Sequence, residues 1–174
     1  EILGSMTAGM AYDLVPFVRE ATPKEVNQPE TNGPMRLVTT GLIEPNQCDW
    51  GTKRCRYLKQ TFSHPVIDIV ESTASPYLWK RLKRVARPKV IVAGLSLRVE
   101  AFLDEAGIYA GAVSTYTIID PDDNVDRLRR LVEYLISDDV THRMKAELGA
   151  TALGGGRITL TKAFLAGLPW QEKD

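Results

Sequence analysis

Four aspartates lie within seven residues of this chain, and clustered carboxylates are what a metal-dependent nuclease or hydrolase requires. They are Asp120, Asp122, Asp123 and Asp126. They surround a D-P-D-D-N turn before an apolar pattern of helical spacing, where acidic side chains interact favourably with the positive end of the helix dipole. No P-D…[DE]-x-K pattern accompanies them. The pattern favours helix capping, and metal-dependent cleavage through Asp122 and Asp123 stays as one alternative hypothesis.

Two cysteines and two histidines could together provide the four ligands of a structural zinc site. They are Cys48, Cys55, His64 and His142, and their spacing matches no familiar zinc motif. The simpler interpretation is two reduced thiols in a cytoplasmic protein. Neither histidine lies in a context typical of a Ser-His-Asp or Cys-His triad. We therefore expect no metal, no cofactor and no catalytic residue in this chain.

The formal net charge is zero, but the charges are segregated along the chain. Residues 36–98 contain 12 lysines and arginines and 4 acidic residues, a net charge of +8, and the rest of the chain has a net charge of −8. A strongly basic stretch in a neutral protein is typical of a surface that binds a polyanion. We expect this positive charge to gather on a single surface of the folded chain.

The elements expected around these residues are strands and helices in no regular alternation. β-Branched and apolar runs predict strands over residues 35–43, 65–70, 89–93, 98–103 and 112–119. Ser75-Pro76 predicts the start of a helix that runs to about residue 86, and a second helical pattern follows residue 124, with Ser137 as a further N-cap. Thr161 is expected to cap a last helical turn, and the proline-rich residues 22–34 to form a loop. The predicted fold class is α+β, with a mostly antiparallel or mixed sheet and two or three helices.

Length and composition predict one domain over residues 1–174, in which residues 1–34 are an N-terminal segment and loop of uncertain packing. The chain begins at Glu1 rather than at a methionine, which indicates processing or a fragment of a larger chain. The longest apolar runs have the length of strands, and no secretory signal is visible. We expect a soluble, cytoplasmic protein with no membrane partner.

Three segments, in this order, resemble one protein family. Residues 36–58 contain L-V-T-T-G-L-I-E-P, followed by W-G and R-Y-L. The second segment, residues 87–118, contains R-P-K-V-I-V-A-G, an aspartate, a Y-x-G turn and T-Y-x-I in that order. The third segment, residues 131–170, contains L-V-E-Y-L-I-S-D and then G-A-T-A-L-G-G-G-R-I-T-L-T-K-A-F-L-A-G-L-P-W. Together they resemble the TaqI-type C-terminal specificity domain, which is the target-recognition domain of bacterial adenine-N6 DNA methyltransferases and fused type II restriction-modification enzymes.

The resemblance implies a non-catalytic domain that recognises duplex DNA, largely from the major-groove side. A methyltransferase domain of the same parent chain would bind S-adenosylmethionine and would flip out and methylate adenine, and a fused enzyme would add a nuclease. The present chain has neither the N-P-P-Y-like loop nor the glycine-rich turn that methylation requires. The expected partners are double-stranded DNA and that methyltransferase domain.

DNA phosphates are neutralised by cationic side chains, and base edges are read by a few polar ones. The predicted DNA-binding residues are Lys53, Arg54, Arg56, Lys59, Lys80, Lys83, Arg84, Arg87, Lys89 and Arg98. Further possible contacts with bases are Asn46, Gln47, Gln60 and Ser96, while Trp50 and Tyr57 are expected in the core. The alternative hypothesis is a protein-interaction or scaffold module whose basic surface binds an acidic protein.

Overall fold

Two four-stranded sheets form the centre of the structure, a computed structural model that describes residues 1–30 and 32–170. The first has the strand order β1-β13-β9-β11, with β1 (Ile2–Leu3), β13 (Thr115–Ile118), β9 (Lys89–Ala93) and β11 (Ala101–Asp104). The second has the order β12-β3-β8-β2, with β12 (Tyr109–Gly111), β3 (Met35–Val38), β8 (Pro65–Ile67) and β2 (Val18–Glu20). Neighbouring strands are antiparallel in both sheets except β12 and β3, which run parallel.

Three two-stranded ribbons extend from these sheets, and all three are antiparallel. They are β4 (Ile43–Glu44) with β5 (Gln47–Cys48), β6 (Cys55–Tyr57) with β7 (Gln60–Phe62), and β10 (Leu95–Ser96) with β14 (Ile158–Thr159). Gly94 allows the chain to turn from β9 into β10, because a Cβ at this position would lie 2.6 Å from the carbonyl oxygen of Ser114. The third ribbon joins the C-terminal part of the chain to the centre.

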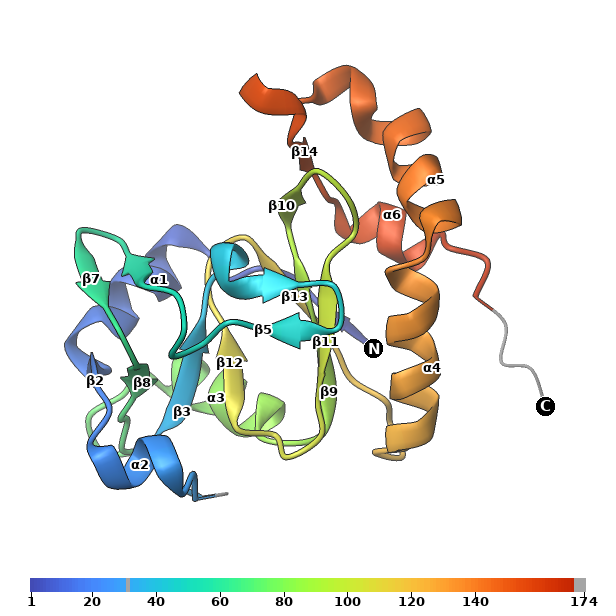
Figure 1. Ribbon diagram of the computed structural model, residues 1–174. Coiled ribbons are helices and arrows are strands. Elements are labelled where there is room, and N and C mark those ends of the chain that lie inside the picture. Colours follow the sequence, from blue (N-terminus) through green and yellow to red (C-terminus); the bar gives the residue numbers. More distant parts are fainter. Residues whose placement is uncertain (31, 171–174) are drawn as a thin grey trace.

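Helices pack against one face of each sheet, and a further core lies between the two sheets. Figure 1 shows the C-terminal helices along one side of the molecule. Successive strand residues point to opposite faces. Leu37 packs with α1 (Ala8–Leu14) and α3 (Pro76–Val85), whereas the next residue, Val38, points into a core between the sheets. In the first sheet Ile91 points into the same core, while Val90 and Val92 pack against α4 (Val125–Leu135), α5 (Asp138–Leu148) and α6 (Lys162–Ala166). Helix α3 and the β4–β5 ribbon therefore lie on opposite faces of the second sheet.

The predicted α+β class is confirmed, with mostly antiparallel sheets. Three helices have ten or more residues, α3, α4 and α5, and the shorter α1, α2 (Pro23–Asn27) and α6 add to the two or three expected. Four 3₁₀ turns lie between these elements, at Val15–Phe17, Thr40–Leu42, Gly149–Thr151 and Gly154–Gly156. Within the described residues, no helix is long and apolar enough to cross a bilayer.

The expected loop over residues 22–34 is wrong in part, because it contains helix α2. Thr22 accepts a hydrogen bond from the backbone N–H of Glu25, and the Glu25 carboxylate accepts one from the backbone N–H of Thr22. This capping box satisfies donors that a helix start otherwise leaves unpaired. Two further parts of the N-terminal segment are held in the sheets, because β1 pairs with β13 and β2 pairs with β8.

Candidate nucleic-acid interface

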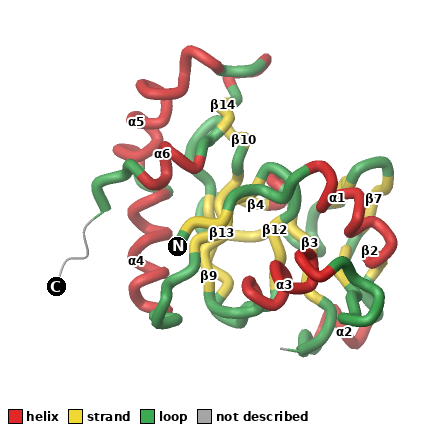
Figure 2. Tube along the Cα trace, turned by 180° about the vertical axis from the view of Figure 1, so that it is seen from behind, coloured by secondary structure: helices red, strands yellow, loops and turns green. Residues whose placement is uncertain are grey.

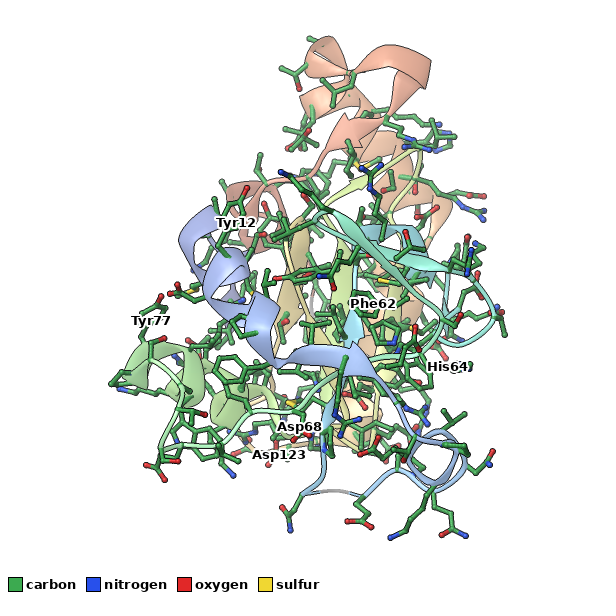
Figure 3. All side chains as sticks on the ribbon, turned by 90° about the vertical axis from the view of Figure 1, so that its left-hand side faces the viewer. Tyr12, Phe62, His64, Asp68, Tyr77 and Asp123 are labelled. Carbon is green, nitrogen blue, oxygen red and sulfur yellow. The ribbon has the colours of Figure 1, made fainter. Side chains whose placement is uncertain are left out.

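The expected single basic surface is wrong, because the fold divides the exposed basic residues among three places and turns Arg36 and Lys89 inward. One group lies on α3, a second on the β6–β7 hairpin, and a third around the β4–β5 turn and the end of β10. Figure 2 shows α3 on the side opposite to the view of Figure 1. In Figure 3, Tyr77 of α3 lies at one edge of the molecule, and His64, which follows β7, lies at the other.

The α3 group is partly engaged in intramolecular contacts. Arg84 pairs with the Glu1 carboxylate, and Arg87 pairs with Asp123 at 2.5 Å. Lys80 and Lys83 are exposed, and the Lys83 ammonium lies 4.6 Å from the centre of the Trp79 ring. Only these two lysines of the predicted α3 contacts extend into solvent without a carboxylate partner among the described residues.

Lys89 is a correction to the predicted phosphate contacts. Its side chain is fully buried and its ammonium donates to Asp104, the residue paired with it across β9 and β11. Asp104 also accepts from the backbone N–H of Ile108 at 3.2 Å and of Tyr109 at 2.9 Å. Burial is the main cause that lowers the pKa of Lys89, against the opposing effect of Asp104. This lysine ties the β11–β12 turn to the sheet and cannot reach a phosphate.

The β6–β7 hairpin carries the second group at the edge of the second sheet. The exposed polar residues of the hairpin and of the position before it are Arg54, Arg56, Lys59, Gln60 and Thr61. Tyr57 points inward, as expected, and its hydroxyl donates to the carbonyl of Ala11 at 2.5 Å. Trp50, on the segment leading to the hairpin, is also buried, and its indole N–H donates to Pro65 at 2.9 Å. Trp50 and Tyr57 therefore support the fold, and the hairpin presents basic, amide and hydroxyl groups to solvent.

The third group combines candidate base contacts with cations. Asn46 forms the apex of the β4–β5 turn with φ 56°, and its backbone N–H donates to Ala101 on β11 at 2.8 Å. Asn46 and Gln47 are both exposed, and the Gln47 amide donates to Asp49 at 2.5 Å. Lys53 pairs with Glu44 at 2.6 Å and with Asp49 at 2.7 Å, which positions its ammonium beside the turn. Polar and cationic groups thus lie together on the face opposite to α3.

Arg98 belongs to this third group, but Ser96 does not provide a base contact. Arg98 is exposed in the loop that follows β10. Ser96 is 6% exposed, and its hydroxyl donates to the carbonyl of Arg98 at 2.5 Å. The prediction for Ser96 is therefore corrected, because this hydroxyl shapes the loop that presents Arg98.

Arg157 is a member of this group that sequence reasoning missed. Ile158 pairs with Ser96 in the β10–β14 ribbon, which brings the exposed Arg157 to the loop of Arg98. The pKa of Glu100 reflects this arrangement, since burial and Glu44 raise it while Arg98, Lys53 and Arg157 lower it, with a net rise. No ion pair joins Arg98 or Arg157 to a carboxylate within the described part of the chain. We call Asn46, Gln47, Lys53, Arg98 and Arg157 the ribbon face.

The aspartate cluster is occupied with structural interactions. Asp120 accepts from the backbone N–H groups of Asp122 at 2.9 Å and Asn124 at 3.2 Å, and it pairs with Arg127 at 2.8 Å. Asp123 pairs with Arg87, and Asp126 pairs with Arg129 at 2.5 Å. These contacts fit the expected turn and helix start, where carboxylates stabilise the first turn of α4.

The cysteines and histidines do not meet as a zinc site. No group of three or more His, Cys, Asp or Glu side chains suited to a metal ion occurs among residues 1–30 and 32–170. Burial raises the pKa of the Cys48 thiol to about 11, and it also raises the pKa of Cys55. His64 packs against the edge of Trp50, with ring centres 5.2 Å apart.

Comparison with known proteins gave no match, either to a protein-family model or to a curated protein.

Proposed function

We propose that this chain is a duplex-DNA recognition domain whose ribbon face contacts the DNA. The observation that carries the proposal is the convergence of Asn46 and Gln47 with Lys53, Arg98 and Arg157, from three segments distant in sequence. Arginine and lysine neutralise phosphates, which dominates affinity for duplexes, and exposed Asn and Gln amides can pair with the N6 and N7 edge of adenine.

The proposed role is target recognition for a bacterial adenine-N6 DNA methyltransferase or a fused restriction-modification enzyme. The support is the resemblance of three ordered segments to TaqI-type specificity domains. In this role the chain is non-catalytic and cytoplasmic, and a methyltransferase domain of the parent chain binds S-adenosylmethionine. A target-recognition domain needs a surface that combines phosphate contacts with base-reading groups, and the ribbon face has both residue types.

The second sheet separates α3 from the proposed DNA interface. Because α3 lies on the opposite face of that sheet, its free lysines do not reach a duplex that rests on the ribbon face. Lys80, Lys83, Arg84 and Arg87 all lie on or directly after α3, so we do not include them among the proposed DNA contacts. Arg54, Arg56, Lys59 and Gln60 on the β6–β7 hairpin stay available at the edge.

Binding of a random-sequence duplex library, followed by selection of enriched sequences, tests the proposal. We expect binding that weakens steeply with salt, and enrichment of a defined sequence motif. Salt-sensitive binding without any enriched motif would favour the alternative, a scaffold module whose basic surface binds acidic proteins. Absence of duplex binding at low salt would refute DNA recognition. Asn46→Ala and Gln47→Ala are expected to relax the enriched motif at one or two positions while leaving the salt dependence unchanged.

A further inference from the structure

Two leucines are exposed where the chain leaves and re-enters the β10–β14 ribbon. Leu97 and Leu153 each have 54% of their surface exposed, among the largest exposures of any bulky apolar side chain in the described residues. Leu97 directly follows β10, and Leu153 precedes the Gly154–Gly156 turn that leads into β14. Isolated exposed leucines are common on protein surfaces, but these two occur on adjoining loops.

Hydrogen bonds and close packing hold the two loops together. The backbone N–H of Leu153 donates to Arg157 at 2.7 Å, and that of Gly156 donates to Leu153 at 3.0 Å. A Cβ on Gly156 would lie 3.7 Å from a methyl carbon of Leu97, so the Leu97 side chain rests against this turn. Figure 1 shows β10 and β14 next to each other at one end of the molecule. The ribbon thus presents two apolar side chains from a preorganised tip.

The charges beside these leucines indicate the partner. Arg98 follows Leu97 in sequence, and Arg157 accepts the turn hydrogen bond from Leu153 through its carbonyl. Both arginines are exposed and have no carboxylate pair among the residues that the structure describes. An apolar tip with an exposed arginine next to each leucine complements a duplex, whose phosphates run along both sides of the stacked bases.

We propose that Leu97 and Leu153 form a wedge that inserts against a base step of the bound duplex, with Arg98 and Arg157 holding the flanking phosphates. The inference rests on the proposed function and adds a mode of recognition to it. Apolar wedges partly unstack and kink DNA, and the cost is lowest at flexible pyrimidine–purine steps. The wedge therefore reads the deformability of one step, whereas Asn46 and Gln47 read base edges.

The test uses the whole chain and a duplex enriched from a random library, in which 2-aminopurine replaces each adenine in turn. We expect wild-type protein to raise the fluorescence of one or two positions, because unstacking relieves quenching. Leu97→Ala with Leu153→Ala should abolish this rise and weaken binding about tenfold, with the salt dependence unchanged. Val70→Ala is the matched control, since Val70 is also 54% exposed but lies in the segment before α3.

The outcomes separate the wedge from the proposed function. If the leucine double variant keeps both the fluorescence rise and the affinity, or if wild-type protein binds without any rise, the wedge is refuted while DNA recognition stands. If wild-type protein binds no duplex, DNA recognition itself fails. Both leucines are exposed, so the variants should fold normally, and an unchanged thermal transition checks this.

Discussion

The buried ion pair of Lys89 and Asp104 is expected to contribute to the stability of the fold but not to DNA binding. Both side chains are removed from water, with 0% and 1% exposure. Asp104→Asn leaves the Lys89 ammonium without a counter-charge and weakens the acceptor for the backbone N–H groups of Ile108 and Tyr109. Removing one partner of a buried ion pair typically costs about 3–5 kcal/mol, because the remaining charge stays uncompensated. We expect Asp104→Asn to lower the free energy of unfolding by an amount in this range.

Lys89→Met should cost less than Asp104→Asn. The remaining Asp104 carboxylate keeps two backbone N–H donors. The Lys89 ammonium left by Asp104→Asn has only neutral acceptors, the new amide oxygen and the carbonyl of Arg87 at 3.4 Å. Urea denaturation followed by tryptophan fluorescence measures both variants. Arg143→Gln is the control, because its exposed pair with Glu147 at an i,i+4 spacing is worth about 0.3–0.5 kcal/mol.

Two results would refute this reasoning. One is a cost for Asp104→Asn as small as that of the Arg143 control. The other is a reduced salt dependence of duplex binding for Lys89→Met, which would mean that this lysine contacts a phosphate after all. We expect Lys89→Met to leave the slope of log affinity against log salt unchanged.

Three further predictions concern titratable groups. Glu100→Gln should tighten duplex binding at pH 7, because it removes a carboxylate that lies among Arg98, Lys53 and Arg157; equal affinities at pH 7 would contradict this. Burial raises the pKa of Glu100, so the difference in affinity between the wild type and the variant should shrink as the pH falls. Glu25→Gln should cost about 1 kcal/mol in urea denaturation, because it removes the ion pair with Arg19 while the glutamine oxygen can still accept from the backbone N–H of Thr22. The contacts with Arg19 and with the backbone of Thr22 lower the pKa of Glu25 to about 2. The contribution of this carboxylate to the free energy of unfolding is therefore fully present above the unfolded pKa near 4 and is lost as the pH falls through 2. A difference in stability between the wild type and Glu25→Gln that persists below pH 2 would contradict this. Cys48 and Cys55 should react slowly with iodoacetamide at pH 8 and rapidly in urea, because burial raises both pKa values; fast reaction of the native protein would contradict this.

Local features of the fold were predictable from the sequence because their partners are near in the chain. Ser137 accepts from the backbone N–H of Val140 at 3.4 Å, and Thr161 from that of Phe164 at 3.1 Å, as their N-cap positions predict. The missed helix α2 also has a local signal, the Thr22-x-x-Glu25 capping box, which the neighbouring prolines obscured. Signals of this kind involve residues within a few positions of each other.

The arrangement of the candidate site was less predictable, because it depends on pairings between distant segments. A count of charges along the chain cannot tell which face of a sheet each residue will occupy. The sequence predicts Lys89 as a surface cation, whereas the β9–β11 register pairs it with Asp104 in the interior. Arg157 lay outside the basic stretch, and only the pairing of β14 with β10 brings it beside Arg98.

The salt dependence of duplex binding tests the central claim most directly, that the DNA contacts lie on the ribbon face. Each phosphate contact contributes about 0.9 to the magnitude of the slope of log affinity against log salt. Arg98→Gln with Arg157→Gln should therefore reduce that magnitude by about 1.8. Lys80→Gln with Lys83→Gln removes the same charge from α3 and should leave the slope unchanged. Equal effects of the two double variants, or an effect confined to the α3 pair, would contradict the account.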